Sequence, residues 1–320
     1  MKLEKLYKLA VKKGIAADPR PKKEIDRLLK KEGDAFKKLK KDEKDNYDTD
    51  RLFNPFVDTR ILNGKGTTNV KRVMVGVDID TSEIMLADRL NEKGKKIDLV
   101  IAHHPSGKAM PSFHEVMSLQ ADVLHKFGVP INVAEGILEP RMKQVEKRVM
   151  PANHFKTSDA AKLLSVPFIC LHTPADNCVT DFLQNIFDKK NCLLVDDVVN
   201  ELNKIPEYKL ANTYSAGPKI VVGNKGKRAG RVMVEMTGGT EGSEKAFEKL
   251  SAAGVGTIVA MHFTEAHLKQ AAEFHINVVV AGHIASDNVG INILLDSIMK
   301  EGSEEIDVVE CSGFRRIKRN

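Results

Sequence analysis

Residues 97–104, with the sequence IDLVIAHH, decide the fold class of this 320-residue chain. An unbroken apolar run of this kind indicates a strand buried on both faces, as in a parallel sheet covered by helices. Two histidines end the run, and Pro105 follows them. A second run of the same kind, INVVVAGH over residues 276–283, also ends in histidine. Both runs predict central strands with chemically active side chains at their carboxyl ends.

Further strands surround these two, and amphipathic helices separate most of them. They are predicted over residues 72–80 (RVMVGVDID), 167–173 (PFICLHT), 255–262 (VGTIVAMH) and 305–311 (EIDVVEC). Strands that alternate with helices imply right-handed crossovers and largely parallel sheets. The fold class is therefore α/β, with two α/β domains whose sheets are largely parallel and with side chains collected at the carboxyl ends of the strands.

Two segments depart from this alternation. Residues 219–236, KIVVGNKGKRAGRVMVEM, predict two strands joined by a Gly-rich turn, so we expect an antiparallel hairpin in the second domain. Residues 130–135, PINVAE, predict a short strand between helices.

The expected domain organisation has three parts. Residues 1–66 form a basic helical segment, and residues 67–205 form a first α/β domain with a helical insertion at about 111–165. Residues 206–320 form a second α/β domain, although the last helix and strand could return to the first.

Composition excludes several classes of protein. The chain is 42% hydrophobic and 29% charged, which is unlike a disordered or fibrous protein. It has no apolar stretch long enough to span a membrane, and its start does not resemble a signal peptide. We therefore expect a cytoplasmic protein without membrane contact. The four cysteines form no CxxC pair and are expected to be reduced and packed.

The positive charge is concentrated near the start of the chain. The net charge is +6, and residues 1–50 contain 16 Lys and Arg against 11 Asp and Glu. Nucleic-acid binding is one interpretation of this segment. Acids alternate with bases along it, however, and no aromatic platform lies between them, which favours a solvated helical face.

Histidines follow several of the predicted strands, at positions 103, 104, 172, 262 and 283. Ligands of open α/β sheets collect beyond the carboxyl ends of the strands, so these side chains are expected to meet in one pocket. Successive side chains of a strand point to opposite sides. His103 and His104 therefore either serve different metal ions or share one after the chain bends at Pro105.

Two aspartates are further candidates, and each also has a structural interpretation. Asp176 follows His172 by four positions, and it could instead cap a helix predicted from residue 180. His283 and Asp287 are also four positions apart, so a helical turn would place them on one face. Asp287 could equally cap the last long helix.

These motifs resemble the NIF-three-like proteins, a family also called type 2 homologues of GTP cyclohydrolase I. The resemblance rests on GVDID, DLVIAHHP, HTPAD, TGGTEGSEKAF and AGHIASD, and it spans about residues 70–311. It implies two α/β domains around a dinuclear metal site, often in a toroidal hexamer. The implied metal ligands are His103, His104, Asp176, His283 and Asp287.

The chain departs from the family pattern at several points. Asp287 stands where the family usually has Glu, which shortens the reach of a bridging carboxylate. The segment between His104 and Asp176 is longer than is typical. In MHFTEAH, residues 261–267, His262 and Glu265 could support the site from outside the ligand set, but structural roles are favoured.

Two functional hypotheses follow. The first is a hydrolase that uses two divalent ions (Zn, Mn or Fe(II)) and metal-bound hydroxide on a nucleotide-like or other heterocyclic substrate. The second is a non-catalytic metal-binding regulator, metallochaperone or assembly factor whose basic N-terminal helices engage a partner.

Overall fold

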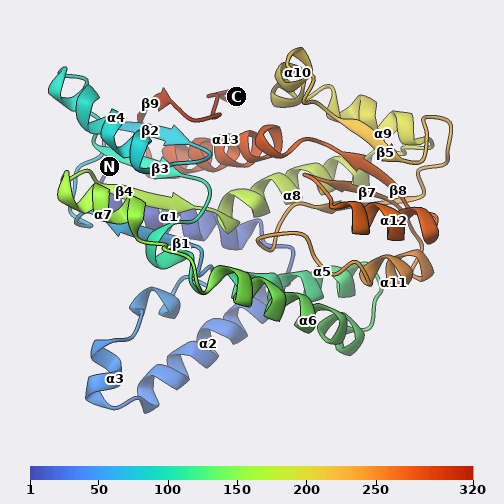
Figure 1. The fold of residues 1–320 in the computed structure, drawn as a ribbon, viewed down its shortest axis with the longest axis horizontal. Helices are drawn as coiled ribbons and strands as arrows, with labels where there is room; N and C mark the ends of the chain where they lie inside the picture. The colour runs from blue at the N-terminus through green and yellow to red at the C-terminus, as the bar shows by residue number, and fades with distance from the viewer. Residues whose placement is uncertain (320) are drawn as a thin grey trace.

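The computed structural model describes residues 1–319, which form two β-sheets surrounded by helices (Figure 1). The strands are β1 (Thr59–Asn63), β2 (Arg72–Gly76), β3 (Leu99–Ala102), β4 (Phe168–Leu171), β5 (Lys219–Val222), β6 (Arg231–Glu235), β7 (Val255–Ala260), β8 (Asn277–Val280) and β9 (Asp307–Glu310).

The α-helices are α1 (Leu3–Ala16), α2 (Lys22–Lys38), α3 (Lys41–Asp45), α4 (Thr81–Glu92), α5 (Leu119–Lys126), α6 (Ile131–Val149), α7 (Lys156–Leu163), α8 (Thr173–Lys189), α9 (Val195–Leu202), α10 (Pro206–Thr213), α11 (Ala246–Ala252), α12 (Glu265–Glu273) and α13 (His283–Gly302). Short 3-10 helices are η1 (Thr49–Leu52), η2 (Gly107–Ala109) and η3 (Phe113–Ser118).

The first sheet has the strand order β1-β4-β3-β2-β9, and all of its pairs except β1–β4 are parallel. In register, Gly76 lies opposite Ala102, and Ala102 lies opposite Cys170. The central strands thus end at one level, so the residues that follow them emerge at the same edge. The last strand of the chain, β9, belongs to this sheet.

The second sheet has the order β5-β8-β7-β6, and only the β5–β8 pair is antiparallel. The prediction of two largely parallel sheets is therefore confirmed, but the predicted hairpin over 219–236 is wrong. Strands β5 and β6 occupy opposite edges of the sheet. The Gly-rich connection between them is anchored by Thr257 and Asn277, which donate hydrogen bonds to the carbonyls of Ala229 and Arg228.

Helices α8 and α13 connect the two sheets. Each buries part of its length against the first sheet and part against the second, and the two pack on each other. The two helices approach each other closely at Gly290, where an added Cβ would lie 2.4 Å from the carbonyl oxygen of Ala175. Because α8 follows β4 and α13 follows β8, this contact sets the distance between the strand ends of the two sheets.

The N-terminal helices differ from each other in burial. Helix α1 is part of the core, since Leu3, Leu6, Ala10 and related side chains are buried against α8 and α13. In α2 and α3 only Ile25 is buried, and Figure 1 shows both helices projecting away from the body.

The segment between β3 and β4 is helical, and the strand predicted over 130–135 is wrong. These residues begin α6, which continues through Pro140 to Val149. Ala134 and Leu138, four positions apart, are buried on the face that packs on α5 and the second sheet. The helical period becomes visible only over the full helix, because Gly136 and Pro140 interrupt it locally.

All four cysteines are free, as predicted. Among the described residues, none of the helices is long and apolar enough to cross a membrane.

Candidate metal centre

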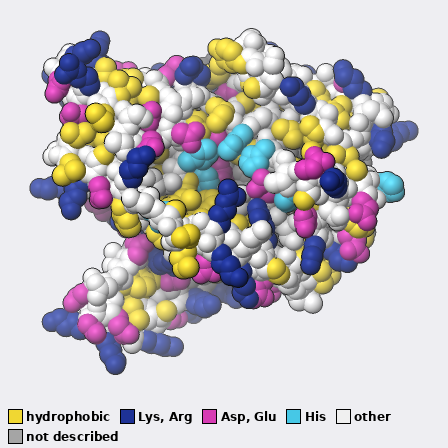
Figure 2. Space-filling model, in the orientation of Figure 1, with side chains coloured by type: hydrophobic (Ala, Val, Ile, Leu, Met, Phe, Trp, Pro, Cys, Tyr) yellow, Lys and Arg dark blue, Asp and Glu magenta, His cyan; other side chains and the backbone are white. Residues whose placement is uncertain are grey.

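A pocket of about 290 Å³ lies where the carboxyl ends of both sheets face each other. Its lining comes from the segments that follow β3, β4, β6, β7 and β8. Figure 2 shows histidine side chains gathered in this hollow at the centre of the molecule. We refer to it as the central pocket.

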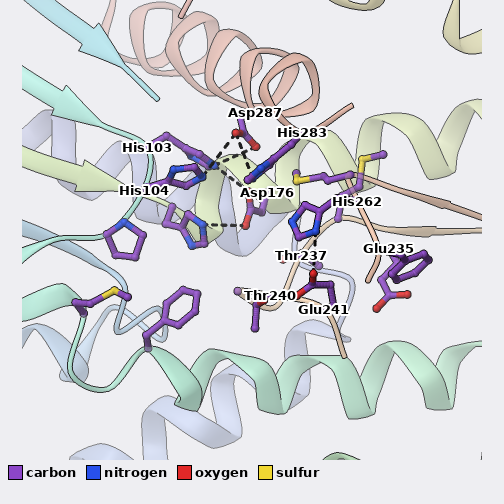
Figure 3. Close-up of a pocket in the computed structure, with 18 residues that line it drawn as sticks. His103, His104, Asp176, Glu235, Thr237, Thr240, Glu241, His262, His283 and Asp287 are labelled. Atoms are coloured by element: carbon purple, nitrogen blue, oxygen red, sulfur yellow. Dashed lines mark hydrogen bonds and ion pairs between the residues drawn. The ribbon is translucent and has the colours of Figure 1, made fainter. Parts of the chain in front are cut away.

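All five predicted ligands line the central pocket (Figure 3). They are His103, His104, Asp176, His283 and Asp287. The two aspartates and His103 are almost fully buried, whereas His104 and His283 are partly exposed toward the cavity. Residues separated by up to 184 positions therefore share one small volume, as the strand-end argument predicts.

Asp287 stands between two groups of histidines. Its Oδ1 lies 3.4 Å from Nε2 of His103. Its Oδ2 lies 3.7 Å from Nε2 of His104 and 3.6 Å from Nε2 of His283. The turn that holds it is helical, since α13 begins at His283, so His283 and Asp287 do lie on one face. The two carboxylate oxygens thus face different partners.

Asp176 completes the buried end of the cluster. Its Oδ1 lies 3.3 Å from Nε2 of His103, and its Oδ2 lies 3.7 Å from Nε2 of His172. Helix α8 begins at Thr173 and not near residue 180, with Pro174 favourably placed in its first turn. Asp176 is therefore inside the helix and makes no capping hydrogen bond, so the capping alternative does not hold.

Three histidines are oriented by hydrogen bonds at Nδ1. His104 Nδ1 donates to Asp78 Oδ1 at 2.6 Å, and His172 Nδ1 donates to Asp58 Oδ2 at 2.8 Å. His103 Nδ1 lies 3.3 Å from the carbonyl oxygen of Leu171. In the neutral form of each imidazole, a proton held at Nδ1 leaves the lone pair at Nε2, which in each case faces the cluster. This is the arrangement that metal-binding histidines require.

At the buried end of the pocket, the attraction between opposite charges outweighs the effect of burial on the pKa values. Burial disfavours protonation of His103, but the carboxylates of Asp287 and Asp176 outweigh it and raise the pKa of His103 well above the ordinary value. Burial likewise disfavours the charged form of Asp287, yet His103 outweighs it and lowers the pKa of this carboxyl group. The pocket is therefore built for a positive charge between these carboxylates.

The outer histidines behave differently. Burial, followed by repulsion from His103 and His172, lowers the pKa of His104 to about 4. Burial also lowers the pKa of His283. Both imidazoles are thus neutral at pH 7 and have the free lone pair that a metal ligand needs.

The buried carboxylate oxygens provide a test of fit. Within residues 1–319, Asp176 Oδ1 and both oxygens of Asp287 are buried without a hydrogen-bond donor. Unsatisfied buried oxygens are costly, and a cation is one way to satisfy them. Three sets of residues each offer ligand atoms that lie within 4.8 Å of one another inside the set. The sets are His103, His104 and His172; His104, His283 and Asp287; and His103, Asp176 and Asp287. The residues therefore fit divalent metal ions.

A second polar group lies on the opposite wall, in the segments after β6 and β7. His262 Nδ1 lies 2.9 Å from Glu241 Oε1, and the imidazole of His262 packs 4.8 Å from that of His283. The carboxylate of Glu241 also lies 3.5 Å from Arg141. The hydrogen bond from His262 lowers the pKa of Glu241 to about 2 despite partial burial.

Glu265, the other residue suggested from MHFTEAH, begins α12 and is exposed outside the pocket lining. His267 is buried, and its Nε2 donates to the carbonyl of Gly242 at 3.1 Å, which is a structural role. His262 lies on the pocket wall.

His172, Asp58 and Asp78 are not among the ligands and supporting residues that the sequence predicts. His172 was recognisable, because it ends β4 as His103 ends β3. Asp78 follows β2 in the same way. Asp58 had no sequence signal, since it precedes the antiparallel edge strand β1.

Comparisons with known proteins show which solved structures this chain resembles. No protein-family model and no curated protein matches the sequence. The crystal structure of a NIF3 superfamily protein from Sphaerobacter thermophilus is similar, at 29% identity and a TM-score of 0.69. The match covers 80% of this chain and 91% of that one. The chain is thus similar to a NIF3 superfamily protein over most of its length. The resemblance carried by DLVIAHHP and AGHIASD is thereby confirmed.

More distant solved structures are also similar. Reduced HcgD from Methanocaldococcus jannaschii has 14% identity and a TM-score of 0.45, with 79% of this chain and 87% of that chain covered. A Bacillus cereus protein related to NIF3 has 11% identity and a TM-score of 0.42, with 79% and 90% covered.

Proposed function

We propose that this protein binds two divalent metal ions in the central pocket and hydrolyses a small nucleotide-like or other heterocyclic substrate there. The observation that carries the proposal is the position of Asp287. Its two buried oxygens have no hydrogen-bond donor and face two different sets of imidazole nitrogens. A carboxylate in this position is suited to bridge two cations.

The donor set divides between two sites. His103, His172 and Asp176 would hold one ion at the buried end, and His104 and His283 would hold the other near the cavity. Asp287 would serve both, so the shorter side chain at this position still reaches each group. Imidazole and carboxylate ligands without thiolate suit Zn, Mn or Fe(II).

Two such ions lower the pKa of bound water and polarise an oxygen-rich substrate. The chain supplies the shape of the site around them. Pro105, Met110 and Phe113 contribute apolar lining to the pocket, and Glu241 and His262 contribute polar lining. At about 290 Å³ the pocket suits a small molecule better than a polymer.

Elemental analysis of purified protein tests the metal part of the proposal. We expect two metal ions per chain in the wild type and less than one in Asp287→Asn. The matched control, Asp181→Asn, changes an exposed aspartate on α8 and should retain two. Equal metal content in all three proteins would contradict the assignment.

Hydrolysis assays test the catalytic part. Metal-loaded wild type should hydrolyse members of a panel of nucleotides, cyclic nucleotides and p-nitrophenyl phosphates, and Asp287→Asn should not. Metal binding with no turnover across the panel would instead favour the non-catalytic regulator, metallochaperone or assembly factor. Assembly into a hexamer, which the family resemblance implies, remains a prediction that sedimentation would test.

A further inference from the structure

Residues 22–47 form a projecting arm that the proposed function does not use. The arm contains α2 and α3, and the rings of Phe36 and Tyr47 pack on each other at 5.0 Å to hold it together. Figure 1 shows it extending from the body, away from the two sheets. The excess positive charge of the protein lies in and near this arm, because residues 1–50 carry a net charge of +5 out of +6.

Acids and bases alternate along the arm in sequence, but α2 separates them in space. At 100° per residue, Ile25, Leu28, Leu29 and Phe36 share one face, and each is at least partly buried. The opposite face is mostly exposed and mostly basic, with Asp34 at its centre and Asp26 and Glu24 at its edges. Its basic side chains, called here the basic stripe, are Lys23, Arg27, Lys30, Lys31, Lys37 and Lys38.

Three acids of the arm are already engaged, whereas Asp26, exposed at the edge of the stripe, has no ion-pair partner among the described residues. Asp34 lies on the stripe and pairs with Lys37 at 3.1 Å, and Glu24 pairs with Arg27 at 2.9 Å. Glu32 accepts a hydrogen bond from Tyr47. Among the described residues, the other stripe side chains have no ion-pair partner, and these are Lys23, Lys30, Lys31 and Lys38. Four lysine side chains are therefore exposed on one side of α2, and Lys23 among them also lines the groove between α2 and α5–α6.

We propose that the basic stripe binds the phosphate backbone of double-stranded nucleic acid, without reading its sequence. The 17 residues of α2 span about 25 Å, the length of about seven phosphates along one strand. The stripe carries no aromatic side chain, so it has no platform for unstacked single-stranded bases.

The orientation of α2 favours nucleic acid over a membrane. Helices that lie in a lipid interface insert an exposed apolar face. Here the apolar face turns inward, where Ile25 is fully buried. Figure 2 shows Lys and Arg side chains at the far end and along the lower edge of the arm. The exposed side of α2 can therefore attract a partner by its positive charge but has no apolar surface to insert into a membrane.

Fluorescence anisotropy with a labelled 20-base-pair DNA duplex of mixed sequence tests the proposal on the full chain. Four phosphate contacts predict that affinity falls about 150-fold between 50 and 200 mM salt. Lys30→Gln/Lys31→Gln should bind more weakly and lose only about 12-fold over the same range, because two contacts are removed. Both lysines are exposed, so melting temperature and metal content should not change.

The matched control is Lys93→Gln/Lys95→Gln, which removes two exposed lysines after α4 and should behave as wild type. Absence of duplex binding at 50 mM salt, or equal binding by the stripe variant, would overturn the proposal. Preferential binding to phosphatidylserine vesicles over the duplex would also overturn it and would indicate a lipid surface. None of these results depends on metal in the central pocket.

Discussion

Substituting Asp58 by Asn tests whether the site extends beyond the ligands that the family resemblance names. Asp58 is fully buried, and its Oδ2 accepts hydrogen bonds from His172 Nδ1 at 2.8 Å and Thr173 Oγ1 at 2.6 Å. Burial disfavours its ionised form, but these hydrogen bonds, chiefly the one from His172, outweigh it and lower the pKa of Asp58. The side chain is therefore an anion behind His172.

The amide introduced by Asp58→Asn has the same shape as the carboxylate and keeps an oxygen for both donors, so the substitution removes mainly the charge. Loss of a carboxylate that orients a metal-binding histidine typically weakens metal affinity by about 10–100-fold, or about 1.4–2.7 kcal/mol. The matched change Asp78→Asn removes the partner of His104. Its carboxylate is 69% exposed and screened by water, so we expect the smaller effect there.

Competitive titration with a chromophoric zinc chelator would measure both constants, and circular dichroism would show that the variants fold. The expected result is a loss at one of two zinc sites in Asp58→Asn, with the second site close to wild type. Unchanged affinity at both sites, in a folded Asp58→Asn protein, would refute the role of His172 as a ligand.

Two further predictions concern packing and pH. Gly290→Ala should lower the free energy of unfolding by about 1–3 kcal/mol in denaturant titrations, because its methyl group would meet the carbonyl of Ala175 and force α8 from α13; an unchanged midpoint would contradict this contact. Glu241→Gln should cost about 1–2 kcal/mol, since its partner His262 is 44% exposed and the pair is partly screened. Because the pKa of Glu241 is lowered to about 2, its pairing with His262 contributes fully to stability above about pH 4.5, and this contribution is lost as the pH falls toward 2. Because the pKa of His262 is raised, the contribution is also lost as the pH rises through the raised pKa of His262. The destabilisation should therefore be largest between about pH 4.5 and 6.5, and a difference that grows steadily toward pH 9 would be inconsistent with the pair.

Much of the site could be predicted because its residues follow strands. A buried parallel strand is apolar along its length, so LVIA and VVVA mark their own ends. His103 stands directly after the first, and His283 follows the second after Gly282. The edge strands were harder. In β5 and β6, a Gly-rich segment between two short apolar runs has the local pattern of a hairpin, whereas the true partners lie over 20 residues away.

The arrangement of charge on the arm also could not be predicted from the sequence alone. Lysines and acids alternate in the sequence, which predicts a solvated surface. Helical geometry places Lys23, Lys30 and Lys31 on one side, and the inward turn of Ile25 decides that this side faces solvent.

The sequence by itself determined the α/β class and the positions of the strand ends, because both depend on the local period of apolar residues. The tertiary structure alone decided that Asp287 lies between two sets of histidines and that Asp58 lies behind His172. These distances depend on the packing of α8 against α13 and on the pairing of β1 with β4. Such contacts join residues far apart in the chain, and the free energy of burying the whole core selects them, which no short stretch of sequence encodes.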